Sequence, residues 1–187
     1  MSSPRGRPPK SDPRLTRDII LTAAAKRMEE SQSGAFSLRR LATDLGVTPM
    51  SLYVHVDGID GVLDALAERC FSGIPDTDLN DPRDGLRVLL AWYCERVLTH
   101  PRLTTVLVSR RGALPIPHQA WTDRVVSLVH AEELPTDWSD ILVDHLHGFA
   151  LSHAAGGSDP LVALEIYRRQ IDVLLGKRAI SAASITC

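Results

Sequence analysis

The chain has 187 residues, of which 44% are hydrophobic and 24% charged, and a formal net charge of −2. This length allows one ordinary domain, or a small domain joined to a medium one. No apolar run approaches the ~20 residues that span a bilayer, and the basic, proline-rich first ten residues lack the apolar core of a secretory leader. Three cysteines without a metal-binding spacing favour a reducing compartment, so we expect a cytoplasmic protein without metal or cofactor.

Charge is distributed unevenly along the chain. Residues 1–50 carry nine Lys and Arg against five Asp and Glu, whereas residues 51–187 carry twelve against eighteen. Binding to a polyanion needs a local basic surface and does not need a basic protein. The front of the chain is therefore a candidate for binding nucleic acid, and the acidic remainder is expected to stay away from it.

Residues 1–13 are expected to form a flexible basic arm. Its segment Arg5-Gly-Arg-Pro-Pro-Lys resembles an AT-hook core, in which an extended arginine enters a narrow minor groove. We expect Arg5, Arg7 and Lys10 to contact the minor groove or phosphates. The alternative is a solvated basic tail.

Apolar periodicity, capping residues and prolines predict only helices in the rest of the chain. A first domain at 14–72 is expected to contain helices at about 14–31, 37–44, 48–55 and 58–72. After a polar connector, a second domain at 81–176 is expected to contain helices at about 82–100, 102–110, 117–132, 136–155 and 160–176. Residues 177–187 are expected to be a loose tail. The predicted fold class is all-α, with a three- or four-helix DNA-binding domain before a helical ligand-binding and dimerisation domain.

The segment 36–57 has the pattern of a helix-turn-helix. Ser37 is a good N-cap for its first helix, and Gly46 supplies the left-handed residue at that helix's end. Thr48 then caps a second helix with Pro49 at its first position. Two helices joined by a short turn containing glycine form the motif whose second helix enters the major groove.

Helical spacing separates the buried from the outward side chains of this motif. Leu52 and Val56 are expected to face the core. Outward residues then become candidates for contact with DNA: Ser37, Arg39, Arg40, Thr48, Pro49, Met50, Ser51, Tyr53 and His55. Hydroxyls and the helix N-terminus suit phosphates, while Met50 and Ser51 lie in the turn that meets base edges. A packed histidine is the alternative for His55.

The stretch Leu41-Ala-Thr-Asp-Leu-Gly-Val-Thr-Pro-Met-Ser-Leu-Tyr-Val-His-Val, followed by Leu63-Asp-Ala-Leu, closely resembles the DNA-binding domain of the TetR (tetracycline-repressor) family. The resemblance covers residues 14–72. It implies a dimeric transcriptional regulator, and it places Arg39 where the family's founding repressor carries an arginine that reads guanine; Arg40 is the alternative. Family members usually have a phosphate-binding lysine where this chain has Ile59, and Asp57 and Asp60 nearby would repel phosphate.

The second domain offers aromatic and histidine side chains that could line an effector pocket. We expect this role for Trp92, His100, Trp121, His147 and Phe149, and plain core packing is the alternative for the apolar ones. His145 and His147 are two residues apart, so they face different sides of a helix and are a poor metal pair.

These features predict a ligand-responsive repressor, not an enzyme. It is expected to bind a pseudo-palindromic operator as a homodimer and to be released by a small apolar effector. The helices at 136–155 and 160–176 are apolar enough to supply the dimer interface. The alternative function is a constitutive or architectural DNA-binding protein without an effector.

Overall fold

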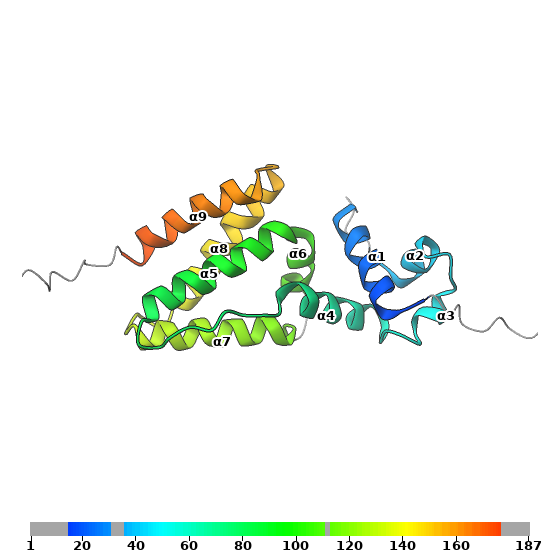
Figure 1. The fold of residues 1–187 in the computed structure, drawn as a ribbon, viewed down its shortest axis with the longest axis horizontal. Coiled ribbons are helices and arrows are strands. Elements are labelled where there is room, and N and C mark those ends of the chain that lie inside the picture. Colours follow the sequence, from blue (N-terminus) through cyan, green and yellow to red (C-terminus); the bar gives the residue numbers. More distant parts are fainter. Residues whose placement is uncertain (1–14, 31–35, 111–112, 177–187) are drawn as a thin grey trace, which may run out of the picture. The chain divides into compact units, whose positions relative to one another are not determined.

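The computed structural model describes residues 15–30, 36–110 and 113–176. Within these ranges it contains nine α-helices and no strand, which confirms the predicted all-α class (Figure 1). Contacts divide the chain into two units. The first runs to Cys70 and adds Arg102–Ile116, and the second comprises Phe71–Pro101 and the chain from Pro117 onward. The two units are described separately.

The first unit is built from five helices: α1 (Arg17–Glu30), α2 (Leu38–Asp44), α3 (Pro49–Leu52), α4 (Gly58–Phe71) and α6 (Pro101–Ser109). The last residue of α4 and the first residue of α6 belong to the second unit. Its core holds apolar residues that recur at helical spacing, among them Ile20, Leu41, Leu52, Val62 and Leu66, all fully buried. Grouping α6 with α1–α4 is a result that the sequence pattern did not indicate, because α6 lies thirty residues beyond α4 along the chain.

Side chains at the ends of α6 explain this grouping. Arg102 donates to the backbone carbonyl of Glu29 at the end of α1. At the other end, Arg110 lies within 3.4 Å of Asp60 and 2.6 Å of Asp64, both on α4. The contacts of α6 within the first unit are therefore partly ionic, and they join residues far apart in sequence.

The second unit contains α5 (Pro82–Thr99), α7 (Ile116–Ala131), α8 (Trp138–Ala155) and α9 (Pro160–Leu174), with α5 packed against both α8 and α9. Asp81 and Asp159 cap α5 and α9 with their carboxylates, and proline follows each, as the sequence predicts. Gly85 lets α5 approach α7, since a Cβ there would lie 3.0 Å from Leu128.

The start of α8 and the end of α3 differ from expectation. The helix expected at about 136–155 begins at Trp138, after Asp137, whose side chain makes no capping bond. The second helix of the helix-turn-helix ends at Leu52 and not near residue 55, because the His55 N–H donates to the Leu52 carbonyl in an i→i−3 bond that tightens the chain into a turn.

None of the helices in the described ranges is long and apolar enough to cross a membrane. Nor do three or more potential metal ligands gather anywhere in the part of the chain that the structure describes.

Candidate functional site

The turn between α2 and α3 is held by hydroxyl caps. The Ser37 side chain accepts from the Arg40 N–H, and the Thr48 side chain accepts from the Ser51 N–H at 3.3 Å. The Thr48 and Ser51 hydroxyl oxygens lie 2.9 Å apart. Gly46 has φ +67°, the left-handed conformation that the sequence predicts at the end of α2. Local hydrogen bonds thus fix how α3 is presented.

Around α3, the buried and exposed side chains separate cleanly. Leu52 and Val56 are buried, as predicted, whereas Met50 is 72% exposed and Tyr53 53% exposed. Val54 is 73% exposed, although it is apolar and was not among the predicted contacts. Val54 lies in the turn that follows α3, so helical spacing from Met50 did not indicate its exposure. The exposed apolar surface at α3 is suited to contact with thymine methyl groups.

The remaining predicted DNA contacts lie on or beside these two helices. Arg39 and Arg40 are exposed on α2, and Thr48 and Pro49 are exposed at the start of α3. Ser51 and His55 are half-buried, so the alternatives for His55 both remain predictions. Arg5, Arg7 and Lys10 lie outside the described residues.

The carboxylates that sequence analysis placed near the phosphates do not behave alike. Asp60 lies 3.4 Å from the Arg110 guanidinium, which compensates its charge. Asp57 is exposed just before α4. The expected repulsion is therefore reduced at Asp60 by a cation fifty residues away in sequence.

In the second unit, aromatic and histidine rings gather around Tyr93 of α5. The Tyr93 cluster comprises Phe71, Tyr93, His118, Trp121 and His147. Trp121 stacks on Tyr93 with ring centroids 4.1 Å apart, and its indole N–H donates to the Leu89 carbonyl. His147 Nε2 lies 3.4 Å from the Tyr93 hydroxyl. Two of the predicted effector residues, Trp121 and His147, are thus brought together by a tyrosine.

His118 is the most unusual member of the Tyr93 cluster. It is 3% exposed, and neither ring nitrogen has a hydrogen-bond partner among the described residues. Burial, together with His147 nearby, lowers the pKa of His118 to about 4. Burial likewise lowers the pKa of His147, against the opposing effect of Asp144. Both imidazoles are therefore neutral at pH 7. An unpartnered buried ring costs free energy, which marks His118 as a polar group that a ligand could satisfy.

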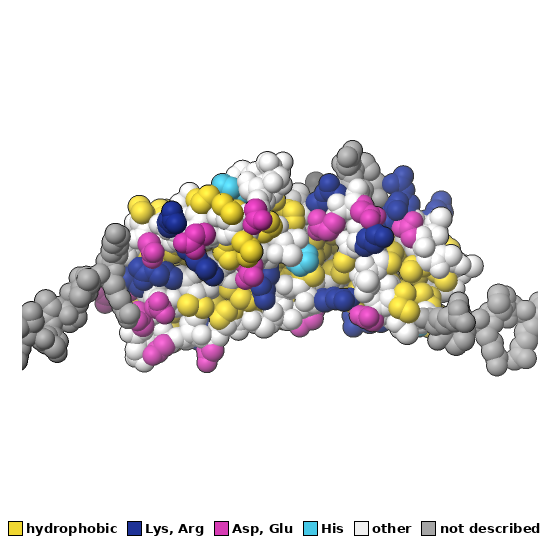
Figure 2. All heavy atoms as spheres, turned by 45° about the horizontal axis from the view of Figure 1, so that its top comes forward, with side chains coloured by type: hydrophobic (Ala, Val, Ile, Leu, Met, Phe, Trp, Pro, Cys, Tyr) yellow, Lys and Arg dark blue, Asp and Glu magenta, His cyan; other side chains and the backbone are white. Residues whose placement is uncertain are grey.

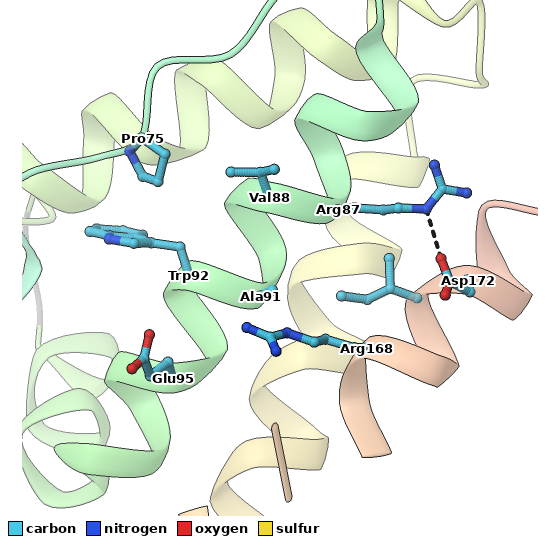
Figure 3. Close-up of a pocket in the computed structure, with 9 residues that line it drawn as sticks. Pro75, Arg87, Val88, Ala91, Trp92, Glu95, Arg168 and Asp172 are labelled. Carbon is cyan, nitrogen blue, oxygen red and sulfur yellow. Dashed lines mark hydrogen bonds and ion pairs between the residues drawn. The ribbon is translucent and has the colours of Figure 1, made fainter. Parts of the chain in front are cut away.

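The other three predicted effector residues lie elsewhere. His100 is half-buried with its ring 6.4 Å from that of Phe71, and burial with nearby Arg96 lowers its pKa. Phe149 stacks on His153 at 4.0 Å and contacts Tyr167. Trp92 lines a groove that runs from α9 across α5, and its ring lies on the side of α5 that faces Pro75 (Figure 3). Arg96 lies 4.4 Å from the centroid of its ring.

Comparison with solved structures identifies the fold. BioQ from Mycobacterium smegmatis superposes with a TM-score of 0.65 at 17% identity, covering 87% of this chain and 98% of that one. A single-residue variant of TetR from Acinetobacter baumannii in complex with minocycline gives 0.62 at 20% identity, covering 87% and 95%. The TetR-family protein ActR from Streptomyces coelicolor in complex with actinorhodin gives 0.61 at 19% identity, covering 88% and 86%. This chain therefore has the fold of TetR-family regulators.

The likeness lies in the fold. No sequence-family model matches the chain, and comparison with curated protein sequences gives no match. One further BioQ structure contains its natural double-stranded DNA operator, with a TM-score of 0.60 at 15% identity, covering 87% of this chain and 98% of that one.

Proposed function

We propose that this protein is a ligand-responsive transcriptional regulator, a cytoplasmic repressor that binds a pseudo-palindromic DNA operator as a homodimer. The observation that carries the proposal is the α2–α3 surface: a hydroxyl-capped helix start with Met50, Tyr53 and Val54 exposed and two arginines on the preceding helix. Such a helix start offers N–H groups to phosphates and side chains to base edges. BioQ, which has the same fold, has been solved on its DNA operator.

Exposed apolar side chains on α8 and α9 support the homodimer. These are Ile141, Leu161, Val162, Ile166 and Val173, with exposed fractions from 38% to 80%. Val162, Ile166 and Val173 recur at spacings of four and seven, so they form one stripe along α9. Beside it lies a shallow, largely apolar hollow of about 380 Å³. Figure 2 shows hydrophobic side chains on the surface of this unit with charged ones between them. A stripe and hollow of this kind suit the side chains of a second copy.

For the effector we propose a small, predominantly apolar molecule bound at the Tyr93 cluster. The members of the cluster are aromatic and histidine rings, and its polar groups are the Tyr93 hydroxyl and the neutral rings of His118 and His147. Few polar groups among aromatic walls are typical of small-molecule sites. Minocycline and actinorhodin are the ligands of the TetR and ActR structures that share this fold. His100 is then a neighbour of the site through the ring of Phe71, whereas Phe149 packs against Tyr167, which is outside the cluster.

The test is a selection of duplexes from a random library with the full-length protein. We expect two inverted half-sites whose centres are about one helical turn, 10–10.5 bp, or a multiple of it, apart. We also expect at least about a thousand-fold preference over a scrambled duplex. Binding without sequence preference would favour the architectural alternative.

A second test concerns the effector. A compound that binds the regulator must favour the DNA-free form, since equal affinity for both forms releases nothing. We expect such a compound to raise the melting temperature, to quench the tryptophan fluorescence and to weaken operator binding. If operator binding is unchanged by every compound in a broad panel of apolar molecules, the protein is a constitutive DNA binder.

A further inference from the structure

A groove of about 470 Å³ lies between α5 and α9 in the second unit, and it is separate from the Tyr93 cluster (Figure 3). Its apolar walls are Pro75, Val88, Ala91, Trp92 and Ile171. Trp92 and Tyr93 are consecutive on α5, yet Tyr93 is buried in the core while Trp92 is half-buried and lines this groove. The groove is as large as many small-molecule sites, which occupy about 300–1,000 Å³.

Besides Arg168, three charged side chains line the groove: Arg87, Glu95 and Asp172. Each of them already has an ion-pair partner. Arg87 donates from Nε to Asp172 Oδ1 at 2.8 Å and from Nη2 to the Gly176 carbonyl at 2.7 Å. Glu95 Oε2 lies 3.7 Å from Nη1 of Arg96, which is outside the lining set. Arg168 remains, with no ion-pair partner among the described residues. Among the cations that line the groove, Arg168 is therefore the one without an ion pair in the described part of the chain, and Glu95 is paired outside the groove.

Figure 3 shows where this charge lies. The Arg168 guanidinium extends from α9 towards α5, and Ala91 separates it from the Trp92 ring on the α5 side. Because the Ala91 side chain is only a methyl group, the surface of the groove between the guanidinium and the indole is not obstructed there; we call this surface the floor of the groove. A flat apolar body can lie along this floor against the indole while an anionic group at its end contacts the guanidinium.

We propose that the α5–α9 groove binds a small aromatic carboxylate, with its ring against Trp92 and its carboxylate on Arg168. Arginine suits this role because its planar fork donates two parallel hydrogen bonds to a carboxylate. A neutral aromatic molecule would fill the apolar floor but leave the charge unpaired. The site goes beyond the proposed function, since binding here requires neither DNA nor occupancy of the Tyr93 cluster.

A second copy of the chain is a poorer occupant of this groove. The apolar stripe proposed for dimerisation contains Val173, which follows Arg168 by five residues. At 100° per residue the two are about 140° apart around α9. Covering the stripe thus leaves the groove open, and the two surfaces are tested independently.

The experiment is calorimetric titration of the full-length protein with 2-naphthoate and with its neutral counterpart 2-naphthamide. We expect the carboxylate to bind about ten-fold more tightly or better, because a hydrogen bond to a charged group is stronger than one to a neutral group. Arg168→Gln should remove this preference and leave amide binding unchanged. Trp92→Leu should weaken both probes.

Arg169→Gln is the matched control, since Arg169 is adjacent on α9 but lines the other hollow and lies 3.7 Å from Glu165. It should leave the carboxylate preference unchanged. The proposal is overturned if neither probe binds, if the probes bind equally, or if Arg168→Gln keeps the preference. It is also overturned if Arg168→Gln converts a dimer to a monomer by sedimentation, because a second copy would then occupy the groove.

Discussion

Arg110, directly after α6, donates from Nη1 to Oδ1 of Asp64 on α4 at 2.6 Å, and its Nε lies 3.4 Å from Asp60 of the same helix. The hydrogen bond and the two carboxylates raise the pKa of Arg110. One guanidinium therefore holds α4 and compensates a carboxylate near its start. This helix begins six residues after Leu52, the last residue of α3, so the charge of its first turn bears on DNA affinity.

Arg110→Gln should weaken DNA binding a few-fold on every sequence, and more at low salt, because Asp60 and Asp64 become uncompensated. Exposed pairs contribute at most about 1 kcal/mol to stability, so the melting temperature should change little. Fluorescence anisotropy at two salt concentrations measures the effect. Arg124→Gln, which removes a charge bonded to Thr77 and Asp76, is the control. Equal losses in both variants would mean that only net charge matters.

Arg39→Ala should cost about 1–3 kcal/mol on the selected operator and relax the choice at one base pair, because arginine pairs bidentately with guanine. Arg40→Ala is the comparison, and the variant that changes base preference identifies the reading arginine. Tyr53→Phe should weaken all duplexes alike, because it removes a phosphate contact. Binding to a panel of single-base operator variants distinguishes these results. An unchanged preference in both arginine variants would contradict the assignment.

Deleting residues 1–10 removes Arg5, Arg7 and Lys10. Each phosphate contact contributes about 0.9 to the slope of log affinity against log salt, so the slope should flatten by up to about three. Replacing the three residues by glutamine at full length should give the same change, which separates charge from chain length. An unchanged slope would support the solvated-tail alternative.

Val173→Asp and Ile166→Asp should convert a dimer to a monomer at micromolar concentration, because each places a charge in the apolar stripe of α9. Val126→Asp, on α7 and 47% exposed, is the control that should leave the dimer intact. Analytical sedimentation measures the mass. Operator affinity should fall with the dimer, since only one half-site is then held. If the wild-type protein itself sediments as a monomer at micromolar concentration, the proposed homodimer is wrong.

Stability should fall as pH decreases from about 6.5 to about 4. The folded protein keeps His118 neutral with a pKa of about 4, whereas the unfolded chain protonates it near 6.5, so the unfolded state binds more protons in this window. The loss is up to about 3 kcal/mol and is complete below pH 4. His147 and His100 act in the same direction. His118→Leu should flatten this part of the curve in denaturant titrations, whereas His130→Gln, at an exposed position, should not. Equal slopes in wild type and His118→Leu would show that His118 does not carry the effect.

The sequence determined the elements whose causes are local. Ser37, Thr48, Asp81 and Asp159 cap helices because a side-chain oxygen needs only an N–H two or three residues away. Leu52 and Val56 were predicted to be buried, since 3.6-residue periodicity sets which side of a helix faces the core. These short-range effects were enough to predict the helix-turn-helix and the all-α class.

Only the tertiary structure decided which distant side chains meet. Trp92 and Tyr93 are neighbours in sequence, but the packing of α5 against α8 and α9 places one in a groove and the other in the core. The docking of the helices also leaves His118 of α7 without a hydrogen-bond partner among the residues that the structure describes. Arg168 of α9 has no ion pair among these residues. Likewise, Arg110 compensates Asp60 across fifty residues. Such pairings depend on how helices dock, which periodicity within one helix does not specify, because every amphipathic helix has the same kind of apolar face to bury.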